Sequence, residues 1–211
     1  MKCVIIAGGE FSCTPELLDR INQADLVVCA DGGARHLRAI DRPPDIHIGD
    51  MDSVSREDLS FLKQNRVTAR RHPVKKDQTD SELCLEYAVR HGAADITLLG
   101  ATGSRMDHTL ANIFLLRQLA DHGISGRIID KTNELYLVNR HLALTGTPGD
   151  CLSLIPVTDN VTGVGLSGLE FPLENESIPM GSTLGISNRF SGQQAEVTIR
   201  TGWIIVARST D

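Results

Sequence analysis

Short apolar runs alternate with segments of helical periodicity over the first two thirds of the chain. The runs predicted as strands are Val4–Ala7, Leu26–Ala30, Ile46–Ile48, Val67–Arg71, Ile96–Leu99 and Ile128–Ile129. The segments between them predicted as helices are Pro15–Gln23, Ala34–Ile40, Arg56–Asn65, Ser81–Arg90 and Asp107–Asp121. Strands joined by helices lie parallel in one sheet, so the pattern predicts an α/β parallel-sheet fold of the Rossmann-like class.

Beyond residue 138 helical periodicity disappears, and glycine, proline and β-branched residues take over. The strands predicted there are Asp150–Val157, Val161–Leu166, Thr183–Ser187, Ala195–Arg200 and Trp203–Arg208. Short strands separated by turn residues are typical of an all-β unit. We therefore expect an α/β domain over residues 1–138, followed by a smaller all-β sandwich domain over residues 139–211.

Composition narrows the class of protein. The chain has 211 residues, is 41% hydrophobic and carries a formal net charge of −6, which disfavours a nucleic-acid groove or a polybasic membrane patch. No apolar stretch approaches the ~18 residues of a membrane span, and the N-terminal apolar run is too short for a signal peptide. The five cysteines are odd in number and lack C-x-x-C spacing. They predict free thiols in a reducing compartment, so we expect a cytoplasmic protein with no membrane or nucleic-acid partner.

Glycines and acids gather where the predicted strands end. In a parallel sheet, ligands bind beyond the carboxyl ends of the strands. Five strand ends carry such residues: Gly8-Gly9, Asp31-Gly32-Gly33, Gly49-Asp50-Met51-Asp52, Lys75-Lys76-Asp77-Gln78-Thr79-Asp80 and Gly100-Ala101-Thr102-Gly103. The repetition predicts one site built from these turns.

Asp50 and Asp52 are the most specific pair among them. Two residues apart in an extended segment, their side chains leave on the same face. Two carboxylates about 4 Å apart repel by roughly 4 kcal/mol at an effective dielectric near 20. A bound cation relieves that repulsion, and oxygen ligands without His or Cys favour Mg²⁺. A helix-cap role would explain Asp52 but not Asp50.

The glycine turns leave two interpretations open. Gly8-Gly9 either lets backbone amides approach phosphate oxygens or forms a tight turn between strand and helix. It lacks the G-x-G-x-x-G spacing of dinucleotide oxidoreductases. Asp31, ahead of a glycine pair, is either a helix cap or an acid of the metal site, and taken together with Asp50 and Asp52 it favours the site.

Mixed charges at the next strand end suit a complex of Mg²⁺ with a triphosphate. Asp77 and Asp80 flank a helix start, where the helix dipole favours acids in any case. Lys75 and Lys76 supply positive charge for phosphate. In the Gly103–His108 segment, we expect Arg105 rather than His108 to contact nucleotide or substrate.

In this order the motifs resemble the thiamine pyrophosphokinase family, and the resemblance covers nearly the whole chain. The matching segments are Asp31-Gly32-Gly33, Gly49-Asp50-Met51-Asp52-Ser53, Asp77-Gln78-Thr79-Asp80, Gly103 to His108, Ser153-Leu154-Ile155-Pro156 and Ser187-Asn188. The resemblance implies an α/β catalytic domain that binds ATP and Mg²⁺ and a β-sandwich that binds thiamine. It also implies a homodimer with thiamine at the subunit interface.

The reaction implied is transfer of the pyrophosphoryl group of ATP to the hydroxyl of thiamine, which gives thiamine diphosphate and AMP. The resemblance assigns the catalytic role to Asp50, Asp52, Asp77 and Asp80, and the Mg²⁺ ligands to Asp50, Asp52 and Asp80. It assigns ATP or phosphate contacts to Gly8, Gly9, Asp31, Gly32, Lys76, Gly103 and Arg105. It assigns thiamine contacts to Asp107, Ser187 and Asn188.

Three positions depart from the family pattern. Ser104 replaces a second glycine, which changes backbone access at that turn. Met51 replaces an aromatic residue between the two aspartates, and we expect it to point into the core. Trp203 lies in an apolar final strand, so the sequence assigns no aromatic residue to stack on thiamine.

Three rival functions share parts of this pattern. A pyrophosphokinase for a hydroxymethylpterin would share the α/β motifs but not the β domain with Ser187-Asn188. A nucleotide-sugar transferase would use Asp50 and Asp52 but not the second acidic motif. A non-catalytic nucleotide sensor would not need the full set of acids.

Overall fold

The chain forms two compact units in the computed structural model, which describes residues 1–73 and 77–210. Unit 1 spans Met1–Lys131 and unit 2 spans Thr132–Asp211. This division falls before β7 (Asn133–Val138), whereas the sequence-based boundary falls after it. Within the described ranges, no helix has the length and apolar character that crossing a membrane requires.

Unit 1 is built on a parallel sheet, as the alternating pattern predicted. Its strands are β1 (Lys2–Ile6), β2 (Leu26–Ala30), β3 (Ile46–Gly49), β4 (Thr68–Arg71), β5 (Asp95–Leu99) and β6 (Ser125–Ile129). Their order is β6-β5-β1-β2-β3-β4, and each neighbouring pair is parallel. The chain runs outward from β1 to β4 and then returns to place β5 beside β1. The strand order therefore reverses between β1 and β5, where sheets of this kind bind ligands.

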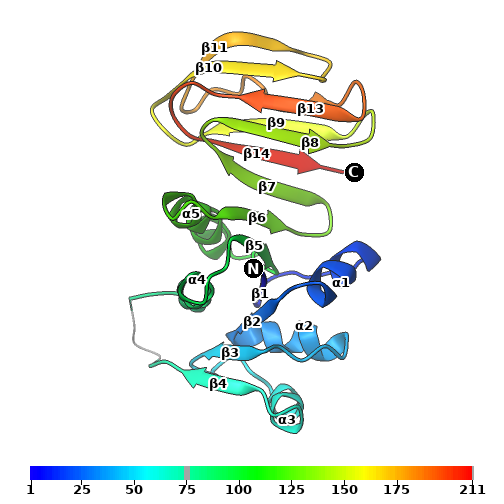
Figure 1. Cartoon of the computed structure of the whole chain (residues 1–211), viewed down its shortest axis with the longest axis vertical. Helices are drawn as coiled ribbons and strands as arrows, with labels where there is room; N and C mark the ends of the chain where they lie inside the picture. The colour runs from blue at the N-terminus through cyan, green and yellow to red at the C-terminus, as the bar shows by residue number, and fades with distance from the viewer. Residues whose placement is uncertain (74–76, 211) are drawn as a thin grey trace. The chain divides into compact units, whose positions relative to one another are not determined.

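Helices cover both sides of these strands (Figure 1). They are α1 (Pro15–Asn22), the short 3₁₀ helix η1 (Asp31–Gly33), α2 (Ala34–Ala39), α3 (Arg56–Gln64), α4 (Asp80–Arg90) and α5 (Met106–Asp121). Apolar side chains of α1, α2 and α3 share one core cluster with β1, β2 and Leu99 of β5. Helix α4 packs against β1, β2 and β3, and α5 packs against β6. The five helices predicted from periodicity are confirmed.

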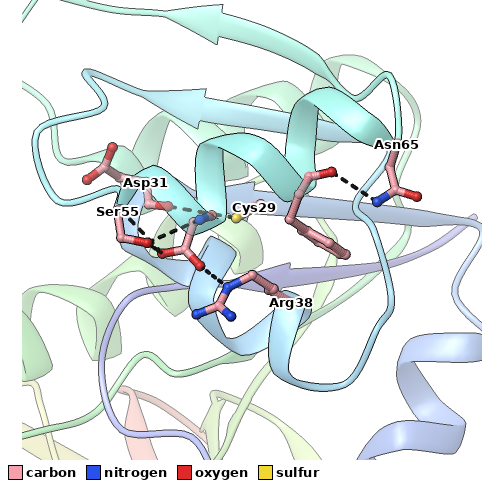
Figure 2. A network of polar contacts seen from close by, with 7 residues as sticks. Cys29, Asp31, Arg38, Ser55 and Asn65 are labelled. Atoms are coloured by element: carbon pink, nitrogen blue, oxygen red, sulfur yellow. Dashed lines mark hydrogen bonds and ion pairs between the residues drawn. The ribbon is translucent and has the colours of Figure 1, made fainter.

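Helix α3 begins with a polar network around the buried side chain of Asp58. Ser55 and Asp58 form a reciprocal capping box, and Asp58 also accepts a 2.6 Å hydrogen bond from Nε of Arg38 on α2. Figure 2 shows Arg38 and Ser55 converging at this start of the helix. Burial raises the pKa of Asp58, but the hydrogen bonds from Arg38 and Ser55 outweigh burial and hold that pKa below its usual value. The carboxylate therefore fastens α3 to α2 in its charged form.

We expect Asp58→Ala to lower the free energy of unfolding by about 2 kcal/mol, because it removes a helix cap and a charge-assisted hydrogen bond. Since folding lowers the pKa of Asp58, its contribution is present above about pH 4 and is lost as pH falls through the lowered value. Chemical denaturation at several pH values measures the difference. Asp121→Ala, which removes an exposed 2.9 Å pair with Arg117, should change stability by no more than ~0.5 kcal/mol. Equal losses for both variants would contradict the network's role.

Unit 2 is made of antiparallel strands. One sheet has the order β12-β9-β14-β7 and the other β11-β10-β13-β8. Besides β7, the strands are β8 (His141–Thr145), β9 (Cys151–Pro156), β10 (Asn160–Ser167), β11 (Leu173–Pro179), β12 (Asn188–Arg189), β13 (Gln194–Thr198) and β14 (Ile204–Ser209). Side chains from both sheets share one core, centred on buried residues such as Leu154, Val164 and Phe190. The prediction of an all-β second half is confirmed.

The predicted strand Thr183–Ser187 is wrong. The segment is a series of turns, with positive φ angles of 87° at Gly185 and 58° at Ser187. Such left-handed conformations interrupt an extended strand, despite the apolar residues Leu184 and Ile186 in this segment.

Candidate active site

A cleft of about 860 Å³ opens at the carboxyl ends of β1, β2 and β5. It lies where the strand order reverses, because β1 has β2 on one side and β5 on the other. Many of its lining residues come from turns that the sequence singled out: Gly8, Gly9, Asp31, Gly32, Asp80, Gly103 and Arg105. The glycine and acidic turns thus meet at one place, as predicted.

Three carboxylates gather beside this cleft. Oxygen atoms of Asp31, Asp50 and Asp52 all lie within 4.8 Å of one another. Asp31 also lines the cleft and is only 6% exposed, whereas Asp52 is exposed. Carboxylates this close repel each other, and that repulsion favours a cation between them.

Hydrogen bonds fix Asp31 against the turn that carries the other two acids. Its Oδ1 accepts from the backbone N–H of Met51 at 2.9 Å, and its Oδ2 accepts from the N–H of Ser53 at 3.2 Å. Gly49 makes this approach possible, since a Cβ there would lie 2.7 Å from Oδ1 of Asp31. The glycine of the G-D-x-D motif therefore leaves room for the aspartate of the D-G-G motif. Met51 is half-buried and adopts a φ of 72° at the turn itself.

The Gly8-Gly9 turn packs against the turn after β5. The N–H of Gly9 donates to the carbonyl of Gly100 at 2.7 Å, and the N–H of Glu10 donates to that of Thr102 at 2.7 Å. A Cβ on Gly9 would lie 2.2 Å from the Thr102 oxygen. Gly9 thus serves close packing with its amide engaged, which favours the tight-turn interpretation there. The phosphate contacts of Gly8 and Gly9 stay predictions.

Helix α5 holds the second of these turns in place. The buried side chain of Asn112 donates to the carbonyl of Ala101 at 2.8 Å. The Thr109 hydroxyl accepts from the N–H of Gly103 at 3.2 Å. Both residues line the cleft. Sequence reasoning assigned neither residue a role.

Arg105 and Asp107 form an exposed ion pair at the start of α5. Nη2 of Arg105 lies 2.6 Å from Oδ2 of Asp107. The hydrogen bond from Arg105 lowers the pKa of Asp107 to about 2, and a bond from the His108 backbone acts in the same direction. Arg105 lines the cleft, whereas Asp107 is not among the described lining residues.

We expect Arg105→Gln to raise the pKa of Asp107 towards its usual value near ~3.9, because the strongest hydrogen bond to the carboxylate is lost. The helix N-terminus should keep part of the depression. An NMR titration of the Asp107 side-chain carboxyl carbon measures the change. Arg117→Gln, which removes a cation that pairs with Asp121 instead, should leave that titration unmoved. A pKa that stays near 2 in Arg105→Gln would overturn the assigned cause.

The remaining predicted residues lie in different places. Asp80 lines the cleft at the start of α4 but is not in the carboxylate group found among the described residues, so its metal role stays a prediction. Asp77 is exposed, and Lys76 lies outside the described residues. Ser187 and Asn188 belong to unit 2.

Asn188 has an evident role within unit 2. The residue is 3% exposed. Its Oδ1 accepts from the N–H of Phe171 at 3.0 Å, and its Nδ2 donates to the Phe171 carbonyl at 2.7 Å. Its side chain thus ties two distant segments together, whereas Ser187 is exposed. Contact of either residue with thiamine stays a prediction.

Two cleft residues that sequence reasoning missed come shortly after the D-G-G motif, beyond Ala34. Arg35 donates to the carbonyls of Gly8 and Gly9, and Nε2 of His36 lies 2.9 Å from the Gly9 oxygen. The rings of His36 and Phe11 lie 5.1 Å apart between centroids. Burial lowers the pKa of His36, which favours its neutral form at the cleft wall. Their position directly after a strand-end turn was the available signal.

Unit 1 combines a parallel sheet, a cleft with glycines in its wall where the strand order reverses, and a group of carboxylates beside that cleft. This combination is typical of α/β enzymes that act on phosphate compounds with a divalent metal. The profile "Thiamin pyrophosphokinase, catalytic domain" matches residues 17–127, and "Thiamin pyrophosphokinase, vitamin B1 binding domain" matches residues 138–205. The chain belongs to the thiamine pyrophosphokinase family.

Individual relatives agree over the full length. The chain is 30% identical to thiamine pyrophosphokinase of Bacillus subtilis, with 100% of both chains covered. The crystal structure of thiamine pyrophosphokinase from that organism matches with a TM-score of 0.90 over 100% of both chains. The thiamin pyrophosphokinase structure from Geobacillus thermodenitrificans is 32% identical and matches with a TM-score of 0.86, over 100% of this chain and 98% of that one.

Proposed function

We propose that the chain is an ATP:thiamine diphosphotransferase, which transfers the pyrophosphoryl group of ATP to the hydroxyl of thiamine and releases AMP. The observation that carries this proposal is the group formed by Asp31, Asp50 and Asp52 beside the glycine-walled cleft. Family membership supports the same reaction. In this proposal unit 1 is a Rossmann-like catalytic domain and unit 2 a β-sandwich that binds thiamine.

The carboxylate group fits Mg²⁺. All of its donors are hard oxygens, and no His or Cys belongs to the group. Asp31 keeps a free lone pair on each oxygen, since each accepts one backbone hydrogen bond. Asp31, Asp50 and Asp52 would hold the ion, with Asp80 approaching from the start of α4. Bound Mg²⁺ neutralises charge on the phosphates and on the leaving group.

The cleft suits the nucleotide on steric and electrostatic grounds. Gly8, Gly32 and Gly103 give phosphate oxygens close access to the backbone, and Arg105 supplies a positive charge at the cleft wall. Lys76 is proposed to add a second charge from the segment before α4. Together, the glycine turns and these two positive charges are expected to hold the triphosphate so that its β-phosphorus is accessible to an incoming hydroxyl.

Protein side chains take little part in the covalent steps of this transfer. The thiamine hydroxyl gives its proton to a carboxylate of the acidic turns, and its oxygen forms a bond to the β-phosphorus of ATP. The bond from that phosphorus to the oxygen bridging to the α-phosphorus breaks in line, and AMP leaves. Catalysis comes mainly from positioning and charge neutralisation, to which Asp50, Asp52, Asp77 and Asp80 contribute.

Thiamine is proposed to bind near Asp107, with Ser187 and Asn188 contributed by the β unit. We propose that the enzyme is a cytoplasmic homodimer with this site at the subunit interface. The fixed turn at Ser187, whose N–H donates to the Ser153 hydroxyl at 3.0 Å, supports a preorganised pocket wall.

The test is AMP formation from ATP and Mg²⁺ by the purified protein, with and without thiamine, followed by chromatography. Equal amounts of AMP and thiamine diphosphate, formed only with thiamine, are the expected result. AMP formed with a hydroxymethylpterin but not with thiamine would keep the transfer chemistry and overturn the substrate. AMP formed when neither acceptor is present would indicate that the protein hydrolyses ATP. No AMP under any condition would contradict the proposed reaction.

A further inference from the structure

A histidine lies in the core of β3, where the sequence reads as an apolar run. His47 is 0% exposed between Ile46 and Ile48. Its Nε2 lies 2.9 Å from the backbone carbonyl of Asp31 on the neighbouring segment. Because a carbonyl only accepts, Nε2 carries the hydrogen of this bond.

The other ring nitrogen of His47 makes this residue costly for the core. Nδ1 is buried and has no hydrogen-bond partner among the described residues. An unsatisfied buried polar atom destabilises a fold, so an apolar side chain of similar size would suit this strand better. Against this cost, His47 contributes the hydrogen bond from its Nε2 to the Asp31 carbonyl.

That bond acts on a strained residue. Asp31 has a φ of 34°, in the left-handed region that residues with a Cβ seldom adopt. Its carbonyl is held by His47 on one side, while its carboxylate accepts the N–H groups of Met51 and Ser53 on the other. The backbone N–H of Ala34 also donates to this carbonyl at the end of η1. The thiol of Cys29 is a further, weak donor to it at 3.9 Å, and Figure 2 shows this thiol beside Asp31.

We propose that His47 is a positioning residue of the metal site: its Nε2–H fixes the backbone of Asp31, and so keeps the Asp31 carboxylate beside Asp50 and Asp52. This inference rests on the proposed function, because it takes that carboxylate group as the cation site. His47 itself does not touch the cation. It acts through the main chain of Asp31, whose carbonyl it holds.

Binding of Mn²⁺ to the full chain, followed by the electron paramagnetic resonance signal of the free ion, tests the proposal without relying on turnover. His47→Leu removes the donor and the unsatisfied Nδ1 together, and should weaken Mn²⁺ binding by about 10–100-fold. His47→Gln places an amide N–H within reach of the same carbonyl and should restore binding to within a few-fold of the parent. The Mg²⁺ concentration for half-maximal AMP formation should rise in His47→Leu, with kcat at saturating Mg²⁺ changed far less.

Ile46→Val on the same strand is the matched control, because it disturbs the core and leaves the Asp31 carbonyl bonded. If His47→Leu does not fold, the smaller His47→Val takes its place. Equal Mn²⁺ affinity in the parent and the apolar variant would overturn the positioning role alone. Weak binding in His47→Leu that His47→Gln does not rescue, or that Ile46→Val reproduces, would also overturn it. A parent protein that binds no Mn²⁺ would overturn the proposed metal site, and this inference with it.

Discussion

Asp52→Ala should abolish AMP formation while leaving the fold intact. Asp52 is exposed and lies with Asp31 and Asp50 in a group whose oxygens are within 4.8 Å of one another. Removing one carboxylate relieves repulsion in the folded state, so the free energy of unfolding should change by no more than ~0.5 kcal/mol. Losing a group that organises the metal and the phosphates should lower kcat by about 10²–10³-fold or more.

Steady-state kinetics and thermal denaturation of the same preparation separate these two effects. Glu57→Ala, which removes an exposed acid at the start of α3, changes the net charge equally and should keep activity. Normal turnover in Asp52→Ala would refute the metal-site assignment. A large loss of stability together with activity would instead make Asp52 a structural residue.

Gly9→Ala should cause a large loss of stability in unit 1. The added Cβ would lie 2.2 Å from the Thr102 oxygen and 2.5 Å from the Gly100 oxygen, and both atoms belong to backbone. Neither can move aside as a flexible side chain would, so the turns after β1 and β5 must separate. The hydrogen bond from Gly9 to Gly100 would be lost as well. We expect a cost of about 3 kcal/mol and a sharp fall in activity.

Gly8→Ala is the matched control for stability. The nearest heavy atoms to a Cβ on Gly8 lie 3.4 Å away, which is ordinary contact. Its cost should stay within ~1 kcal/mol in the same chemical denaturation experiment. Similar losses for the two variants would show that backbone entropy, rather than the close approach of the two turns, dominates at this site.

The parallel sheet of unit 1 was predictable because its buried strands are nearly continuous apolar runs with helices between them. Unit 2 was harder to predict from the same kind of reasoning. Strand β11 (Leu173–Pro179) is mostly exposed and polar, so it carries no apolar alternation. The segment Thr183–Ser187 has strand-like residues, yet positive φ angles turn it away from a sheet.

Metal binding by the acidic turns could be predicted from the sequence, but the arrangement of their carboxylates in space could not. Asp50 and Asp52 are near neighbours in sequence, whereas the place of Asp31 in the group depends on β2 lying beside β3 and on the space at Gly49. His47 could not be found from sequence, because its role is a single long-range bond to a backbone carbonyl. Arg35 and His36 act the same way on the Gly9 carbonyl.

The return of β5 to β1 has a consequence for synthesis of the chain. Lys2 pairs opposite Asp95, so one edge of β1 stays open until a strand made much later arrives. A nascent chain released only as far as β4 already contains all three acids of the carboxylate group. It also exposes an apolar strand edge that can pair with another chain. A pause in synthesis between β4 and β5 therefore leaves this edge of β1 without the strand that covers it in the finished sheet.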